Sequence, residues 1–148
     1  MSLLYKRRIL LAEDDDNDAE LTINALKDNK LADRVDRVED GELLLDYLFC
    51  RSKYENRTTG IPAVLLLDLK MPKKDGIEAL KEIRKDKRFK LLPVVVLTSS
   101  KEEQDILDGY ELGINAYVVK PVEFDKFVEA IKNIGCFWTV HNQLPPEF

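Results

Sequence analysis

The chain has 148 residues, of which 45% are hydrophobic and 34% are charged; this composition fits one globular domain and excludes a disordered chain. The formal net charge of −5 lacks the basic excess that direct binding to nucleic acid usually requires. No apolar stretch approaches the roughly 18 to 20 residues that span a bilayer, so no membrane association is expected.

Five short apolar runs alternate with five helical patterns along the chain. Strands are expected near residues 8–12, 34–38, 63–67, 93–97 and 116–119. The runs in the middle of the chain are continuously apolar, which is typical of parallel strands covered on both faces. Strict alternation with short connections predicts an α/β fold, a doubly wound five-stranded parallel sheet with helices on both faces.

The expected helices are marked either by capping residues or by apolar stripes. Asp16, Asn17 and Asp18 are expected to cap the first helix, because their side-chain oxygens can accept hydrogen bonds from free backbone amides. Later helices are indicated by apolar stripes, which comprise Leu44, Leu45, Leu48 and Phe49, then Ile77, Leu80 and Ile83, and finally Phe124, Phe127, Val128 and Ile131. The polar stretch 51–62 is either a helix end with a surface loop or a partner-contact loop.

Four of the strands end in residues that can do chemistry. Glu13 and Asp14 follow the first strand, Asp68 the third, Thr98 the fourth and Lys120 the fifth. The carboxyl ends of parallel strands share one edge of a sheet, and ligands bind in the crevice beyond that edge. We therefore expect three carboxylates, a hydroxyl and an ammonium to form one site.

The acidic turn 13–18 carries five acids in six residues and would repel an anionic cofactor such as a nucleotide. Two unit charges about 4 Å apart repel by roughly 4 kcal/mol at an effective dielectric near 20, so converging carboxylates need a counter-ion or a shared proton. Mg²⁺ suits oxygen ligands and readily adds a phosphoryl oxygen to its shell.

A zinc site is not expected. His141 is the only histidine, and the two cysteines, Cys50 and Cys136, lack metal-type spacing. Two core-like thiols fit a reduced, cytoplasmic chain. A carboxylate nucleophile, Mg²⁺, a lysine and a threonine instead suit phosphoryl transfer, in which positioning and charge neutralisation carry most of the catalysis.

The residues of this site stand in a recognisable order, which is Glu13-Asp14, Asp68 followed by Met71-Pro72 and Gly76, then Thr98, then Lys120-Pro121. With 30 residues from Asp68 to Thr98 and 22 from Thr98 to Lys120, the set resembles the signature of response-regulator receiver domains. The resemblance implies a flavodoxin-like sheet of order 2-1-3-4-5. The resemblance covers about residues 7–138. From its length, the chain is expected to be a single receiver domain over residues 1–148, with a core at about 7–138, a C-terminal tail at 139–148 and no output domain.

The resemblance implies that Asp68 accepts a phosphoryl group from the phosphohistidine of a sensor histidine kinase. Mg²⁺ would be held by Glu13, Asp14, Asp68 and the main-chain carbonyl of Lys70, directly or through water. A phosphatase of the haloacid-dehalogenase type is an alternative, but it places an acid two residues after its nucleophile, where this chain has Lys70. We expect no enzyme activity beyond the protein's own phosphorylation and dephosphorylation.

The same resemblance implies a switch. Thr98 and Lys120 would contact the aspartyl phosphate, and Tyr117 would be the aromatic side chain that reorients on activation. A pseudo-receiver or scaffold that works without phosphorylation is the other alternative. The complete set of acids, threonine and lysine argues against it.

More narrowly, the chain resembles the single-domain regulators paired with bacterial phytochrome-type sensor histidine kinases. This likeness rests on the insert 51–62, the segment 72–76 and the tail motif Phe137-Trp138…Leu144-Pro145. Signal would leave through the receiver surface itself, by protein contact or as a phosphate relay. The apolar stripe of the last helix continues through Ile134 to Trp138. It predicts either a homodimer through the face from the fourth helix to the last helix, or a tail folded onto its own core.

Overall fold

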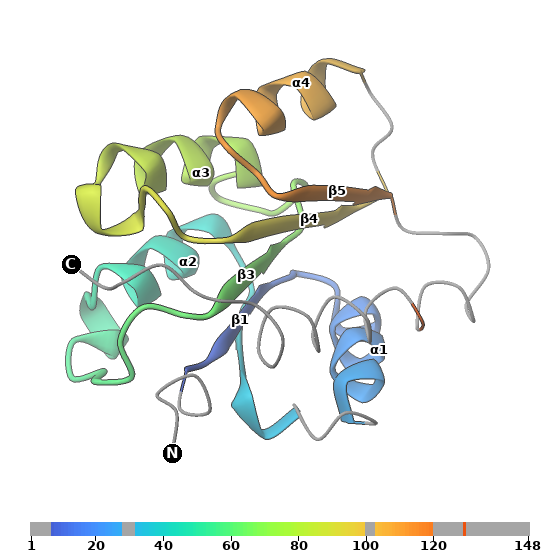
Figure 1. Cartoon of the computed structure of the whole chain (residues 1–148). Helices are drawn as coiled ribbons and strands as arrows, with labels where there is room; N and C mark the ends of the chain where they lie inside the picture. The colour runs from blue at the N-terminus through green and yellow to red at the C-terminus, as the bar shows by residue number, and fades with distance from the viewer. Residues whose placement is uncertain (1–6, 28–31, 100–102, 120–128, 130–148) are drawn as a thin grey trace.

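The computed structural model describes residues 7–27, 32–99, 103–119 and 129 (Figure 1). Five strands form one parallel sheet in the order β2-β1-β3-β4-β5, which confirms the predicted flavodoxin-like topology. The strands are β1 (Ile9–Ala12), β2 (Val35–Val38), β3 (Val64–Leu67), β4 (Val94–Thr98) and β5 (Ala116–Val119). Each strand begins and ends within one residue of its predicted position.

Helices cover both faces of the sheet, as predicted. Those described are α1 (Asp16–Lys27), α2 (Gly41–Leu48), α3 (Gly76–Lys85) and α4 (Glu103–Glu111), with short 3₁₀ turns η2 (Ala32–Arg34), η3 (Ser52–Tyr54) and η4 (Lys87–Phe89). α1 packs on one face, and α2 and α3 pack on the other (Figure 1). The four apolar residues that predict a last helix lie outside the described part of the chain; they are Phe124, Phe127, Val128 and Ile131. Among the described helices, none is both long and apolar enough to cross a bilayer.

The start of α1 corrects one prediction. Asp15, not the segment Asp16 to Asp18, caps the helix: its carboxylate accepts a hydrogen bond from the Asp18 amide at 2.8 Å. The Asp15 carbonyl already accepts the first helical hydrogen bond, from the Ala19 amide at 2.9 Å, so Asp16 is the first helical residue. The acids at 16 and 18 lie in the first turn, where negative charge still suits the helix dipole.

Side-chain alternation along the strands builds two apolar cores. Leu10 and Leu65 belong to the core under α2 and α3, whereas Leu11 and Leu66 belong to the core under α1. Every residue of β1, β3 and β4 is buried, because helices cover both faces of these central strands. The edge strands β2 and β5 are mostly half-buried. This difference explains why the central strands read as unbroken apolar runs in the sequence.

The insert 51–62 is a surface segment that is anchored to α2 mainly through Arg57 and Tyr54, which both contact Tyr47. The Arg57 guanidinium lies 4.0 Å from the ring centroid of Tyr47 and donates a hydrogen bond to the Tyr47 carbonyl at 2.9 Å. It also donates to the Gly60 carbonyl at 2.7 Å. The Tyr47 and Tyr54 rings meet edge to face at 5.2 Å. These contacts fix the insert at the amino edge of the sheet, before β3 begins.

A second arginine ties three loops together at the same edge. Within the described residues, the half-buried Arg84 of α3 donates hydrogen bonds to five backbone carbonyls. The acceptors are Phe89, Lys90, Leu92, Leu112 and Gly113, at 2.7 to 3.3 Å. Burial lowers the pKa of the Arg84 guanidinium. These bonds connect the end of α3 to the entry of β4 and to the turn between α4 and β5.

We expect Arg84→Ala to lower the free energy of unfolding by about 2 to 4 kcal/mol, because five backbone carbonyls, three of them in partly buried hydrogen bonds, lose a charged donor at once. The matched control is Lys85→Ala, which removes an exposed cation from the next position of the same helix and should change stability by less than about 0.5 kcal/mol. Urea denaturation of both variants measures the difference. Equal midpoints for the two variants would contradict this role for Arg84.

Candidate functional site

The predicted site residues lie at the carboxyl edge of the sheet. Glu13 directly follows β1, Asp68 directly follows β3, and Thr98 is the last residue of β4. These three strands are parallel neighbours, so their ends meet at one edge. Thr98 pairs with Val119, the last residue of β5. Lys120, which follows Val119 in the sequence, lies outside the described residues.

Three carboxylates converge at this edge. Glu13, Asp14 and Asp68 each place one oxygen so that the three atoms lie within 4.8 Å of one another. Glu13 is 3% exposed and Asp68 is 8% exposed, whereas Asp14 is open to solvent. Like charges at this separation repel, and partial burial strengthens the repulsion because the local dielectric is low. An anionic, all-oxygen donor set fits a hard divalent cation such as Mg²⁺ or Mn²⁺.

Backbone hydrogen bonds hold two of these acids to the neighbouring strands. The Glu13 amide donates to the Val38 carbonyl at 3.0 Å, and the Asp68 amide donates to the Ala12 carbonyl at 3.0 Å. Each acid is therefore placed by the sheet register itself. The positions of the carboxylates follow from the strand pairing and not from a flexible loop.

Arg37 of β2 is a supporting residue that was not predicted from the sequence. Its guanidinium donates to the Glu13 carbonyl at 3.0 Å and to the Asp14 carbonyl at 3.3 Å. The same side chain forms an ion pair with Asp16 at 2.9 Å. It thus fixes the backbone of the acidic turn and adds a positive charge beside it. The signal in the sequence was a basic residue near the end of the strand expected at 34–38.

Lys70 lies near the start of the loop 69–75 that connects Asp68 to α3. The Lys70 amide donates to the Asp68 carboxylate at 3.1 Å, which orients that carboxylate. The loop closes through the Gly76 amide, which donates to the Leu69 carbonyl at 2.7 Å. A Cβ at Gly76 would lie 2.7 Å from the Asp68 carbonyl oxygen, so only glycine fits without displacing the loop.

The two predicted switch residues occupy different environments. Thr98 is fully buried at the end of β4. Tyr117 of β5 pairs with Val96 and is half-buried against the core under α2 and α3. The structure thus brings Glu13, Asp14, Asp68 and Thr98 to one edge of the sheet, while Tyr117 lies two residues before the end of β5.

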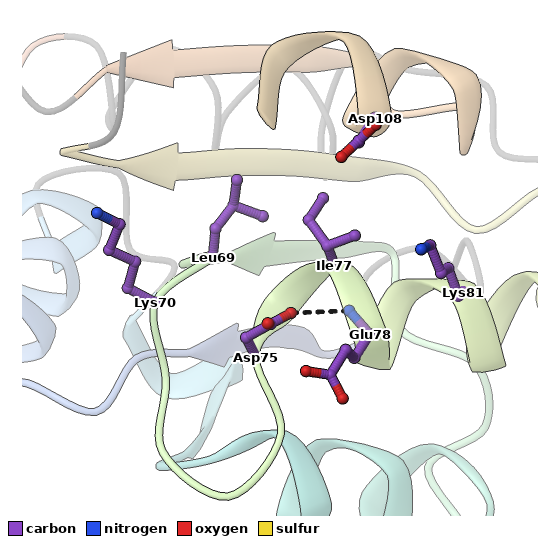
Figure 2. Close-up of a pocket in the computed structure, with 7 residues that line it drawn as sticks. All are labelled: Leu69, Lys70, Asp75, Ile77, Glu78, Lys81 and Asp108. Atoms are coloured by element: carbon purple, nitrogen blue, oxygen red, sulfur yellow. Dashed lines mark hydrogen bonds between the residues drawn. The ribbon is translucent and has the colours of Figure 1, made fainter. Parts of the chain in front are cut away.

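A pocket of about 400 Å³ opens beside the loop after Asp68, between α3 and α4 (Figure 2). Its lining consists of Leu69, Lys70, Asp75, Ile77, Glu78, Lys81 and Asp108. None of the three clustered acids lines it, so the pocket lies beside the acidic cluster and is distinct from it. Figure 2 shows Ile77 pointing toward α4, which carries Asp108, while Lys70, Asp75, Glu78 and Lys81 surround the pocket with charged groups.

The comparisons with known proteins agree with this geometry. Residues 9–132 match the response regulator receiver domain family. Response regulator Rcp1 of Synechocystis sp. is 36% identical over 137 residues, which cover 93% of this chain and 92% of Rcp1. The Mn²⁺-bound form of Rcp1 superposes with a TM-score of 0.87, with 95% of this chain and 99% of that chain covered.

Two further solved structures are similar. The phosphorylated cyanobacterial phytochrome response regulator RcpA is 37% identical with a TM-score of 0.87, covering 95% of this chain and 99% of RcpA. The bacteriophytochrome response regulator RtBRR is 52% identical with a TM-score of 0.75, covering 95% of this chain and 84% of RtBRR. The chain therefore belongs to the response regulator receiver domain family and is homologous to two-component response regulators such as Rcp1.

Proposed function

We propose that Asp68 is the phosphoacceptor of a two-component phosphotransfer reaction. The observation that carries the proposal is the convergence of the Glu13, Asp14 and Asp68 oxygens to within 4.8 Å at the carboxyl edge of the sheet. In the reaction, an Asp68 carboxylate oxygen attacks the phosphorus of a kinase phosphohistidine. The new O–P bond forms as the P–N bond breaks, and the electron pair of the broken bond stays on the imidazole nitrogen.

A divalent cation, most simply Mg²⁺, is part of this proposal. Glu13, Asp14, Asp68 and the main-chain carbonyl of Lys70 would hold it, and when bound it would neutralise the acids and the incoming phosphoryl oxygens. The donor set supports the assignment because every side-chain ligand is a carboxylate. The Mn²⁺-bound form of the relative Rcp1 also supports it.

The remaining roles are proposed from the similarity to receiver domains and from the order of these residues in the sequence. We assign the Thr98 hydroxyl and the Lys120 ammonium to the transferred phosphoryl group, as hydrogen-bond donor and point charge. Tyr117, two residues before the end of β5, is assigned as the aromatic side chain that moves on activation. Apart from its own phosphorylation and dephosphorylation, the protein is proposed to catalyse no reaction. The missing acid at position 70 supports this, since a phosphatase of the haloacid-dehalogenase type would need one there.

We further propose a phytochrome-type sensor histidine kinase as the phosphoryl donor, in the cytoplasm. The support is the similarity to RcpA and RtBRR, which are phytochrome and bacteriophytochrome response regulators. Output is proposed to pass through a homodimer that uses the face from α4 to the last helix. On α4, the Tyr110 side chain is 53% exposed, which supplies apolar surface for such a contact.

The first test is phosphoryl uptake. With Mg²⁺ and either acetyl phosphate or a phosphorylated phytochrome-type kinase, the wild-type chain should gain one phosphoryl group by intact-protein mass spectrometry, and Asp68→Asn should gain none. The matched control is Asp75→Asn in the same loop, because asparagine preserves the helix cap that Asp75 provides. Uptake by Asp68→Asn at the wild-type level would refute the assignment.

The second test concerns the metal. Asp14→Asn should weaken Mg²⁺ binding by about tenfold, or about 1.4 kcal/mol, because one anionic ligand is lost. Without metal, the same variant should melt no lower than wild type, since its carboxylate repulsion is reduced. Isothermal titration calorimetry and thermal denaturation measure the two effects. Glu20→Gln, at an exposed position of α1, is the control that should leave Mg²⁺ affinity unchanged.

The third test concerns the dimer. Sedimentation velocity over a range of protein concentrations, with and without beryllium fluoride as a phosphoryl mimic, should show a dimer that Tyr110→Glu weakens. Leu91→Glu changes a comparably exposed apolar residue outside α4 and serves as the control. A monomer mass at every concentration in both conditions would rule the dimer out.

A further inference from the structure

The loop from Asp68 to α3 contains a strained turn at its tip. The Lys74 amide donates to the Pro72 carbonyl at 2.7 Å, and the residue between them, Lys73, has φ of +66°. A hydrogen bond across a single residue with positive φ is the pattern of the rarer, strained γ-turn. A side chain other than glycine is uncommon in this conformation. Strained turns persist where the surrounding structure holds them in place.

The start of α2 presses directly against this tip. A Cβ added at Gly41 would overlap the Lys74 carbonyl oxygen and crowd the Lys74 Cβ, so the two backbones touch with no room for a side chain. Gly41 is buried at the first position of α2. The loop tip therefore cannot move toward α2, and any larger residue at position 41 would push it away.

Ion pairs hold the tip from both sides. The Lys73 ammonium lies 3.6 Å from the Asp40 carboxylate, whose side chain is 8% exposed. The Lys74 ammonium lies 2.8 Å from the carboxylate of Glu82 on α3. Asp40 also accepts a hydrogen bond from the Leu43 amide at 2.8 Å, so its carboxylate is fixed by the α2 cap. The tip is thus clamped between α2 and α3.

We propose that Gly41, Asp40 and Glu82 are positioning residues for the divalent-cation site. The clamped tip belongs to the same short loop, 69–75, that carries the Lys70 carbonyl and donates the Lys70 amide to Asp68 at 3.1 Å. Because the Gly76–Leu69 hydrogen bond closes this loop, a shift of its tip is transmitted to its first residues. The inference rests on the proposed function, since it concerns the cation that Asp68 is proposed to share.

The physical gain is preorganisation. A loop already held in its ligand-bearing conformation loses little conformational freedom when the cation binds, so less of the binding free energy is spent on ordering it. Residues that orient metal ligands typically change metal affinity by about 10- to 100-fold when mutated. The clamp is therefore expected to act on cation affinity more than on the chemistry of Asp68.

The test is Gly41→Ala, with Gly60→Ala as its control. Gly60 has φ of +77° in the distant insert, so alanine there also strains the backbone but touches no part of the clamp. By calorimetry, Gly41→Ala should bind Mg²⁺ about tenfold more weakly than wild type, and Gly60→Ala should bind it equally well. At saturating Mg²⁺, phosphoryl uptake by Gly41→Ala should recover toward the wild-type rate.

Glu82→Gln is the milder second variant, used in case Gly41→Ala does not fold. It removes only the charge of Glu82, whose side chain is 45% exposed, and should weaken Mg²⁺ binding by about two- to threefold. If the folded variants bind Mg²⁺ with wild-type affinity, and the wild-type chain takes up a phosphoryl group, the proposed role of the clamp is overturned. The proposed function then stands. If wild type binds no Mg²⁺, both are overturned.

Discussion

Three carboxylates meet at one edge of the sheet, and the fold holds them there against their mutual repulsion. The oxygens of Glu13, Asp14 and Asp68 lie within 4.8 Å of one another, an arrangement that a folded chain would avoid without external support. The sheet register supplies that support, because the Glu13 and Asp68 amides are bonded to neighbouring strands. Carboxylates held this close together favour a hard cation, which is the basis of the proposed phosphoacceptor site.

Arginine side chains hold many of the turns and loops in place. The strands are four or five residues long, so much of the chain runs in turns and loops whose carbonyls need donors. Arg37, Arg57 and Arg84 are all half-buried, and each donates to carbonyls of segments distant in sequence. The planar, multi-donor guanidinium suits this task better than the single ammonium of lysine. One of the three holds the acidic turn, and the other two hold the opposite edge.

Much of the fold was predictable because local and global signals agree. Continuous apolar runs marked β3 and β4, and their polar ends placed Asp68 and Thr98 at one edge. The features that were not predicted depend on contacts that form only when the chain has folded. The contacts of Arg37 require knowledge of strand order, the cap at Asp15 depends on where the turn enters the helix, and the fit at Gly41 exists only once α2 meets a distant loop. Such features leave little trace in periodicity or composition.

Strand β3 separates the insert 51–62 at its amino end from Asp68 at its carboxyl end, so the two parts can be changed independently. The insert 51–62 precedes this strand and Asp68 follows it, so a four-residue strand of about 13 Å lies between them. A substitution in the exposed part of the insert, at Thr58 for example, meets solvent and not the acids. The insert is thus the natural place to attach a fluorescent reporter or an affinity handle that leaves the chemistry of the acidic edge untouched.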